Sequence, residues 1–549
     1  FACQWRRCRG IIKQSKRVTR LRERRCAHLT TVKRRHDTEG EVADLRCDRS
    51  PEYITGAAAW VAPAMPQMAD AELVSFSGPS WTSRGTQMVE SEPHRALLTD
   101  LYELTMAAGY FEHKAGVRAT FELFVRSLPP ERTFLLACGL ESALDYLETF
   151  HFTEEEVRFL RQQPAFHSIS DGFFDYVRGL RFTGDVAAIP EGTVVFAEEP
   201  LMQVSAPAAE AQIVETYLLS VINYETLAAT KAARTVRAAA GKDVIEFGAR
   251  RAQGPEAGLR AARAAYVGGC AATSNVLAGF YYGIPLAGTA SHSWVQTFSS
   301  ERESFEALLD SFPDHAILLI DTYDTIAAAE LASSLGRKVA GVRLDSGDLL
   351  EESRRVRQIL DRHGLNATKI VASGDLNEYK VRDLIIGGAP IDYFGVGTDL
   401  VTSRDVPALN VVYKLVEIEE AGRVEYKTKL SPHKAYAPGR KQVFRFCSGG
   451  LYHHDLIARE GENYADSISL LQPVMKGGKR LAPRLAVEEI RASAQVNLAR
   501  LPAKYQSLEP GPQYPVEKSA ELESLHEWVR ERVFGETSGL APGLRSQRR

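Results

Sequence analysis

Short apolar runs that each end in polar residues recur through the middle of the chain. They occupy residues 244–251, 286–292, 316–322, 339–348, 369–375 and 393–399. Runs of this length that are almost entirely apolar are typical of parallel strands buried on both faces. Because the polar residues follow the apolar ones, we expect them to lie at the carboxyl ends of the strands.

Most of the gaps between these runs have a helical period. In residues 349–360, for example, leucine, isoleucine and valine recur near every 3.6 residues among charged ones, and Gly364 then supplies a helix stop signal. Alternating strands and helices predict an α/β fold in which parallel strands close into a barrel. Ligands bind such barrels at the carboxyl ends of the strands, where the polar residues of this chain are expected.

The sequence on both sides of the barrel region has a different pattern. Before it, we expect helices at 97–106, 140–150, 154–162 and 208–239, and strands at 120–125, 184–186, 192–196 and 201–204. After the run at 411–416, residues 427–445 return to a β-like pattern. Helices are expected at 487–500 and 520–533, and the tail from Gly535 is expected to fray.

These patterns divide the chain into four parts. Residues 88–205 form the first part of a β-rich and helical domain, 206–416 the α/β barrel with the active site, and 417–549 the return strands of the β-rich domain and a C-terminal helical region. Residues 1–87 are basic and lack apolar periodicity, which predicts a disordered extension or an artefact of gene prediction. A nucleic-acid-binding arm and an organelle transit peptide are alternative interpretations of that composition.

The overall composition narrows the class of protein. The 549 residues are 44% hydrophobic and 25% charged, as is ordinary for a globular protein, and the formal net charge of −3 gives no general attraction to nucleic acid or anionic lipid. No apolar run approaches the roughly 18 residues that span a bilayer. The 7 cysteines form no CxxC pair, which favours free thiols in a reducing compartment, and therefore a cytosolic protein.

The run 341–348, Gly-Val-Arg-Leu-Asp-Ser-Gly-Asp, brings an arginine and two carboxylates to the end of one strand. Arginine binds phosphate oxygens through its planar fork, carboxylates bind a metal ion or ribose hydroxyls, and the Ser-Gly pair lets the backbone approach an anion. A salt-bridged strand end is the alternative interpretation.

The motifs, taken in order, resemble those of the nicotinate phosphoribosyltransferase family. The matching segments are 98–106, 246–254, 273–279, 288–293, 341–348 and 395–399, and the likeness extends from about residue 97 to 515. This resemblance implies a type II phosphoribosyltransferase, in which an irregular α/β barrel is flanked by a β-rich domain. It further implies a homodimer with active sites at the interface, which joins nicotinate to phosphoribosyl pyrophosphate with coupled ATP hydrolysis in NAD salvage.

The resemblance also implies where the base binds. Phe247 would stack on the pyridine ring, and Tyr102 of the partner subunit would cover its other face. Arg250 would meet the carboxylate or a phosphate, although the adjacent Arg251 is not distinguished from it. Ser274 and Asn275 stand where relatives that use nicotinamide carry an aspartate, and the absence of a repelling charge favours the acid as substrate. Core packing is the alternative interpretation of Phe247.

The remaining implied residues serve the ribose, the phosphates and ATP. His292 corresponds to a histidine that ATP phosphorylates. Arg343, Asp345 and Asp321 would surround the ribose, the pyrophosphate and a Mg²⁺ or Mn²⁺ ion, with Asp321 and Asp345 as its ligands. The terminal phosphate would lie on small residues with accessible backbone N–H groups. Lys414 would add charge there, and a solvated lysine is the equal alternative interpretation. These small residues are Ser373, Gly374, Gly395, Gly397 and Thr398.

Three other functions fit the sequence less well. A nicotinamide phosphoribosyltransferase is disfavoured by Ser274 and Asn275. A barrel aldolase needs a buried lysine at a strand end, and most of the strand ends carry none. A nucleic-acid-binding protein would interleave basic and aromatic residues on a folded module, which the basic N-terminal segment does not do.

Overall fold

The computed structural model describes residues 94–431 and 434–538. The expectations for residues 1–87 and for the end of the C-terminal tail therefore lie outside the described residues. Among the described residues, no helix is both long and apolar enough to cross a membrane.

Six parallel strands form the barrel expected from the apolar runs. The strands are β6 (Asp243–Glu246), β7 (Ala272–Thr273), β8 (Ile317–Leu319), β9 (Gly341–Leu344), β10 (Lys369–Ala372) and β11 (Tyr393–Val396). Their spatial order is β7-β6-β11-β10-β9-β8, so that the last strand in sequence pairs with the first. This pairing bends the sheet into a ring that is open between its edge strands, β7 and β8.

The run at 286–292, expected to be a barrel strand, does not form one. Leu286 makes a single parallel bridge to Thr273 of β7, and a loop then leads to α10 (His292–Thr297). This segment lies in sequence between β7 and β8, so the barrel is irregular at its open seam.

Helices cover the outside of the barrel. They are α8 (Pro255–Val267), α9 (Val276–Tyr282), α11 (Glu301–Ser311), α12 (Thr325–Ser334), α13 (Leu349–Arg362), α14 (Glu378–Ile386) and α15 (Thr398–Val401). Leu344 and Val342 on β9 pack with Val356 and Leu360 of α13 in one buried cluster. Val356 and Leu360 belong to the helical period that predicted α13, which explains why that helix forms where expected.

The β-rich domain is built from strands on both sides of the barrel sequence. Its largest sheet has the order β13-β12-β1-β5-β3-β17-β18, and a smaller sheet has the order β16-β14-β15-β19. The strands of the larger sheet are β13 (Arg423–Tyr426), β12 (Val411–Glu420), β1 (Arg118–Val125), β5 (Pro200–Pro207), β3 (Asp185–Ala188), β17 (Gln472–Lys476) and β18 (Lys479–Arg480). Those of the smaller sheet are β16 (Ser467–Ser469), β14 (Lys441–Ser448), β15 (Leu451–Arg459) and β19 (Val516–Lys518).

The pairing of β12 corrects one predicted boundary. Residues 411–416 were expected in the barrel region, but they pair antiparallel with β1 in the seven-stranded sheet. The barrel elements therefore end with α15.

Five other helices lie near predicted positions: α2 (Leu101–His113), α3 (Leu140–Thr149), α4 (Glu154–Arg161), α16 (Val487–Arg500) and α17 (Ala520–Ser538). Helix α5 (Asp171–Gly179) was not predicted, and α17 continues to Ser538, although the tail was expected to fray from Gly535. Two further boundaries are corrected. The first helix begins after Asp100 rather than at residue 97, where a 3-10 turn, η2 (Arg95–Leu97), ends instead. The helix expected at 208–239 is two helices, α6 (Ala208–Ile213) and α7 (Glu215–Ala238), which meet at Val214.

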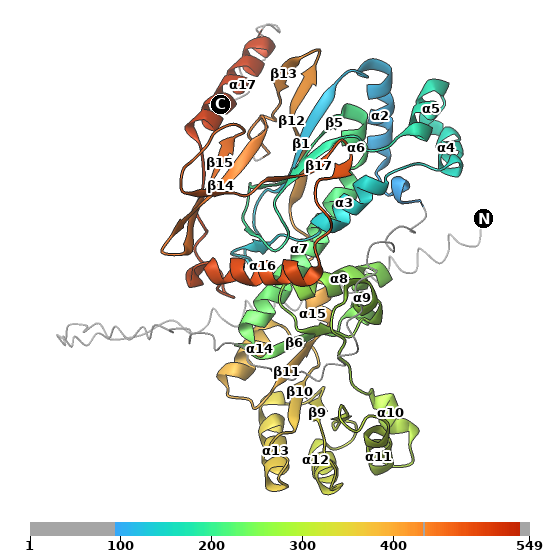
Figure 1. Ribbon diagram of the computed structural model, residues 1–549, viewed down its shortest axis with the longest axis vertical. Coiled ribbons are helices and arrows are strands. Elements are labelled where there is room, and N and C mark those ends of the chain that lie inside the picture. The colour runs from blue at the N-terminus through green and yellow to red at the C-terminus, as the bar shows by residue number, and fades with distance from the viewer. Residues whose placement is uncertain (1–93, 432–433, 539–549) are drawn as a thin grey trace, which may run out of the picture. The chain divides into compact units, whose positions relative to one another are not determined.

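Helix α7 connects the two halves of the described fold. It contacts α3, β2 (Leu135–Leu136) and β12 on one side, and α8, α14 and β6 on the other (Figure 1). Most of its residues after Thr226 are buried. The helix packs against neighbours on several faces at once, and its small alanine side chains allow that close packing.

Candidate active site

The carboxyl ends of the barrel strands bring the predicted residues of the phosphoribosyl site together. Arg343 lies on β9 and Asp345 directly follows it, Asp321 follows β8, Ser373 follows β10, and His292 begins α10. The carboxyl ends of parallel strands lie along the same edge of the sheet, so residues that are far apart in sequence meet there.

Arg343 is the centre of this cluster. Its Nη2 lies 2.6 Å from Oδ1 of Asp345, its Nε donates to the Ser373 hydroxyl at 2.8 Å, and its Nη1 donates to Thr289 Oγ1 at 2.7 Å. These contacts hold the guanidinium plane in one orientation. Thr289 was missed in the sequence analysis, although it lies within the motif that contains His292.

Asp345 is held ionised by its neighbours. Burial alone would raise the pKa of this carboxyl, but the hydrogen bond from Ser373 and the charges of Arg343 and His292 hold the pKa below its ordinary value. The Ser373 hydroxyl lies 2.5 Å from Oδ1 of Asp345, whereas the second oxygen, Oδ2, faces His292 at 3.8 Å from Nε2. One carboxylate oxygen is therefore directed toward the histidine.

His292 and Asp321 complete the cluster. Nδ1 of His292 lies 3.1 Å from the hydroxyl of Thr322, and 40% of the side chain is exposed, so the ring is both anchored and accessible. Asp321 accepts hydrogen bonds through Oδ2 from the backbone N–H of Asp345 and the hydroxyl of Ser346. Its other oxygen, Oδ1, is buried and has no hydrogen-bond partner among the described residues.

An apolar cavity of about 400 Å³ lies beside this cluster. Phe247, Trp294 and Phe312 contribute aromatic side chains to its wall, and Thr289, Ala290 and Ser291 line the side nearest Arg343. The guanidinium carbon of Arg343 is 6.0 Å from the centroid of the Phe247 ring. A flat aromatic molecule that carries a negative charge fits this combination of apolar wall and adjacent cation.

Three glycines at or near the strand ends differ in what an added Cβ atom would contact. At Gly374 φ is +92°, and an added Cβ would lie 1.9 Å from the carbonyl oxygen of Asp345. At Gly395, within β11, an added Cβ would lie 2.5 Å from the Phe247 ring, so this glycine makes room for the aromatic wall. A Cβ at Gly397 would meet only the backbone of residues 247 and 248, at 3.2 Å or more. Packing against Phe247 explains why residue 395 is a glycine without any role for phosphate. The expected contact of Gly395 with phosphate stays a prediction.

The residues predicted to recognise the base lie around the same edge, but with different exposure. Arg250 and Arg251 are both exposed in the 3-10 turn η4 (Ala249–Arg251), which follows β6. Ser274 and Asn275 follow β7. The Asn275 side chain accepts a hydrogen bond from the N–H of Ala278 and so caps α9.

Tyr102 and Lys414 do not join the cluster within one chain. Tyr102 lies on α2, where its hydroxyl hydrogen-bonds to Glu215 and the side chain is 45% exposed. Lys414 lies on β12, and its neighbouring charges are Glu215, Arg126, Lys429 and Lys434. The expected contribution of Lys414 to the phosphate site of its own chain is therefore wrong, because β12 belongs to the β-rich sheet.

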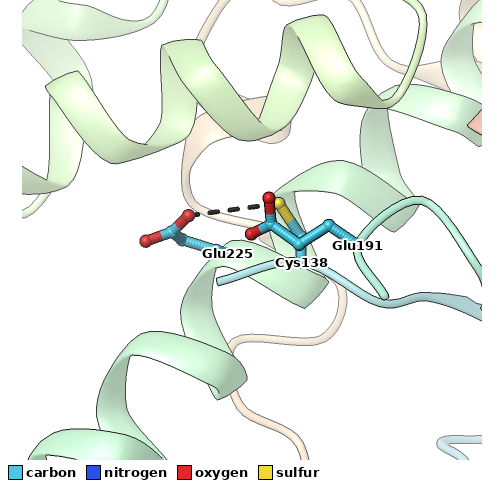
Figure 2. A group of neighbouring side chains, drawn as sticks. All are labelled: Cys138, Glu191 and Glu225. Atoms are coloured by element: carbon cyan, nitrogen blue, oxygen red, sulfur yellow. Dashed lines mark hydrogen bonds between the residues drawn. The ribbon is translucent and has the colours of Figure 1, made fainter. Parts of the chain in front are cut away.

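A second group of potential metal ligands is already filled by an arginine. Cys138, Glu191 and Glu225 lie together in the buried interior, and Figure 2 shows the thiol directed at Glu225. Arg263 lies 2.6 Å from Glu191 and 3.2 Å from Glu225, and burial raises the pKa of the Cys138 thiol. A second arginine, Arg260, lies 3.1 Å from Glu225, so two guanidinium groups offset the two carboxylates. The thiol stays protonated, and this cluster is therefore a structural charge network.

The fold and the strand-end cluster together define a type II phosphoribosyltransferase. Comparison with known proteins agrees: residues 97–223 match the nicotinate phosphoribosyltransferase N-terminal domain and residues 463–526 match its C-terminal domain. The chain belongs to the nicotinate phosphoribosyltransferase family.

Individual relatives support this assignment over most of the chain. A nicotinate phosphoribosyltransferase of Mycobacterium tuberculosis is 45% identical over 455 residues, which cover 81% of this chain and 94% of the relative. The Bacillus subtilis enzyme of the same name is 38% identical, with 80% and 96% covered. The crystal structure of the human nicotinic acid phosphoribosyltransferase matches with a TM-score of 0.70 and 30% identity, and covers 78% of this chain and 99% of that one.

Proposed function

We propose that the protein joins nicotinate to phosphoribosyl pyrophosphate, giving nicotinate mononucleotide and pyrophosphate, in the salvage route to NAD. The observation that carries this proposal is a cluster of charged side chains beside an apolar cavity: Arg343, Asp345, Asp321 and His292. Arg343 hydrogen-bonds to Thr289 and Ala290, which line that cavity. The family of the chain and the names of its relatives support the same reaction.

The proposed reaction requires charge to be stabilised rather than a protein nucleophile. Displacement of pyrophosphate from ribose C1 builds positive charge on the sugar and negative charge on the leaving group. Arg343 would bind the departing oxygens, and the ionised Asp345 would face the ribose. Because the other side chains of the cluster fix Arg343 before substrate arrives, little reorganisation is needed in the transition state.

The base would enter the cavity against Phe247. The apolar wall would remove water from the pyridine ring, and Arg250 would attract the nicotinate carboxylate. Ser274 and Asn275 place hydroxyl and amide groups at the end of β7, which do not repel that carboxylate.

A magnesium or manganese ion fits beside Asp321 and Asp345. The unpartnered, buried Oδ1 of Asp321 and the available Oδ2 of Asp345 are hard oxygen donors, and Mg²⁺ is commonly held by one or two carboxylates together with substrate phosphates. Such an ion would offset the charge of the pyrophosphate. The terminal phosphate of the substrate would lie on the turns Ser373–Gly374 and Gly397–Thr398, which we name the phosphate cradle.

We further propose that ATP phosphorylates His292. The anchored and partly exposed imidazole lies close to Asp345 and Arg343, where an added phosphoryl group would contact a metal-bound pyrophosphate. In His292→Ala the folded protein should keep a slow reaction but lose both ATP stimulation and nicotinate-dependent ADP release. Undiminished stimulation by ATP would contradict this role.

The active site is proposed to be completed by a second copy of the chain. Tyr102 shares an exposed apolar face with Leu98, Leu101 and Met106, and a second such face, Val276, Leu277 and Phe280 on α9, borders the base site. Apolar patches of this kind mark association surfaces. A homodimer would bring Tyr102 of one subunit to Phe247 of its partner. Cytosolic location remains our expectation.

The deciding experiment compares nicotinate with nicotinamide, each with phosphoribosyl pyrophosphate and with or without ATP. We expect nicotinate mononucleotide to form. The kcat/KM for nicotinamide should be lower by at least about a hundredfold, since burying an unmatched polar group is strongly disfavoured. Preferential use of nicotinamide would assign the protein to the alternative reaction instead.

A further inference from the structure

Five charged side chains form a buried series that none of the proposed chemical steps uses. We name it the ion array: Arg132, Asp405, Lys231, Glu378 and Arg234. Arg132 binds Asp405 through two contacts, of 2.8 and 3.0 Å. Lys231 lies 2.8 Å from Asp405 and 2.7 Å from Glu378, and Nε of Arg234 lies 3.1 Å from the other oxygen of Glu378.

Four of the five side chains of the array are closed to solvent, and Asp405 is partly exposed. Exposure of the side chains is 0% for Arg132, 2% for Lys231 and Arg234, 0% for Glu378 and 24% for Asp405. Burial of ion pairs is costly, and well-packed apolar residues of similar volume often stabilise a fold as well or better. An array of three cations and two carboxylates therefore invites an explanation beyond stability.

Each turn of the phosphate cradle continues into a segment that ends at a carboxylate of the array. These segments, residues 373–378 and 397–405, are the two loops of the cradle. Glu378 is the first residue of α14, and Asp405 lies after the short helix α15, which the second loop contains. Lys231 bridges the two carboxylates, so it connects the far ends of the two loops. The loops are also joined directly, because the Asn377 amide donates to Asp399 at 3.0 Å.

Backbone strain lies in the same two loops. Asp375 and Ser403 have positive φ values, 46° and 40°, which are unfavourable for residues other than glycine. Strain of this kind persists only where surrounding contacts fix the backbone. Arg132 supplies one such contact, from Nη2 to the Ser403 hydroxyl at 3.4 Å.

The array also attaches the loops to elements outside the barrel strands. Lys231 and Arg234 belong to α7, and Arg132 comes from the segment between β1 and β2. Arg234 donates to the carbonyl oxygens of Ser507 and Leu508 at 3.2 and 2.9 Å. The two loops are thus held against α7 and against segments from both ends of the described chain.

We propose that the ion array is a positioning device for the phosphate cradle, in which Lys231 sets the spacing of the two loops that receive the terminal phosphate of phosphoribosyl pyrophosphate. This inference rests on the proposed function, because that function places the phosphate on these loops. Arg132, Lys231, Glu378 and Arg234 are positioning residues, since their burial keeps them from the substrate.

Asp405→Asn separates positioning from simple electrostatics. The substitution removes a negative charge from the array, so an effect of charge alone would tighten anion binding. Loss of positioning predicts the opposite: binding of ribose 5-phosphate weakens about tenfold, because small misplacements of a binding group have large effects. Calorimetry with ribose 5-phosphate measures this without turnover, and kinetics should show a matching rise in KM for phosphoribosyl pyrophosphate with KM for nicotinate unchanged.

Asp455→Asn is the matched control. Asp455 is equally engaged by two contacts with an arginine, Arg445, and is fully buried, but it lies in the four-stranded sheet that includes β14 and β15. The control should lose stability and keep the affinity of the parent for ribose 5-phosphate. Equal weakening in the control would overturn the inference, because the effect would then follow from lost stability.

Lys231→Arg provides a second test that preserves every charge but replaces the compact ammonium of the bridge with a longer, planar guanidinium. It decides the question if Asp405→Asn does not fold, and it too should weaken ribose 5-phosphate binding. Parent affinity in a folded Lys231→Arg protein would overturn the inference. A parent protein that binds ribose 5-phosphate but does not use nicotinate would instead contradict the proposed function and leave the inference standing.

Discussion

Arg343 shows how one side chain can be fixed for chemistry by its neighbours. Arg343→Ala should reduce kcat by a factor of about a hundred or more, because removal of one preorganised donor to developing charge typically costs about 3 kcal/mol. Steady-state kinetics at saturating substrate would measure this. Arg343→Lys, which keeps the charge and loses the planar fork, is the control, and should recover only part of the rate. A kcat within tenfold of the parent in the alanine variant would make Arg343 structural.

Gly374 is the residue at which the site tolerates least change. Gly374→Ala should abolish activity and lower the free energy of unfolding, because the new methyl would overlap the carbonyl oxygen of Asp345. Gly364→Ala is the matched control: its φ is +74°, yet a Cβ there meets nothing within 4 Å, so only the left-handed backbone penalty of about 1 kcal/mol applies. Urea unfolding and activity assays on both variants would check this. Equal losses in the two variants would show that backbone conformation alone is responsible.

The chemical identity of the strand-end residues could be predicted from sequence, but their partners could not. Arg343 and Asp345 stand in one short motif after an apolar run, so their placement follows from local pattern. Thr289 and the orphan oxygen of Asp321 become visible only in three dimensions, since both depend on contacts between different strand ends. The exposure of Arg250 could not be predicted from the apolar pattern either. Strand β6 ends at Glu246, and Arg250 lies in the turn that follows.

At the scale of elements, the break between α6 and α7 has a physical cause. Glu103 of α2 is fully buried, and its carboxylate accepts hydrogen bonds from the backbone N–H and the hydroxyl of Thr216 in the first turn of α7. The amphipathic pattern runs across Val214 without interruption, so the sequence predicts one helix. The Glu103 carboxylate therefore accepts hydrogen bonds from the first turn of α7, whose N–H groups have no partner within the helix. Because Glu103 is far from Val214 in sequence, the local pattern does not predict this contact.

The same carboxylate should make stability depend on pH. Burial is the largest cause that raises the pKa of Glu103 to about 7, against the hydrogen bonds from Thr216 and Thr99, which lower it. Between the unfolded value of 4.5 and about 7 the folded state holds the proton and the unfolded state does not, so this group makes stability fall as pH rises. Glu103→Gln should flatten that fall in urea-unfolding curves measured from pH 5 to pH 7. An unchanged slope in the variant would show that Glu103 is ionised in the folded protein.

Most elements could be predicted because their periodicity is local. Helix α16 has the predicted bounds, and β10 begins at the first residue of its predicted run. The run at 286–292 is as apolar as a strand, yet it makes only one bridge. Pairing with neighbours decides whether such a run becomes a strand, and pairing is not encoded in period. The assignment of 411–416 failed for the same reason.

At the scale of the whole molecule, the proposed dimer can be tested by mixing two inactive variants. Tyr102→Ala and Phe247→Ala should each be inactive alone. If each site takes Phe247 from one subunit and Tyr102 from the other, half of the randomly mixed dimers contain one intact site, and activity should recover to about a quarter of the parent. Mixing after mild dissociation, followed by activity assay, would measure this. Absence of recovery in dimers shown to have exchanged subunits would place Tyr102 outside the site.

The pairing of β1 with β12 has a consequence for folding during synthesis on the ribosome. Arg118 pairs with Glu419, and β3 pairs with β17, so the seven-stranded sheet joins residues that are separated by the entire barrel sequence. On the ribosome, β1 emerges long before its partner, and loop closure over such a distance is slow. The barrel strands, by contrast, all emerge between Asp243 and Val396. During synthesis β1, β5 and β3 can pair with one another and the inserted barrel can assemble, whereas the sheet is completed only when β12 and β17 emerge with the last third of the chain.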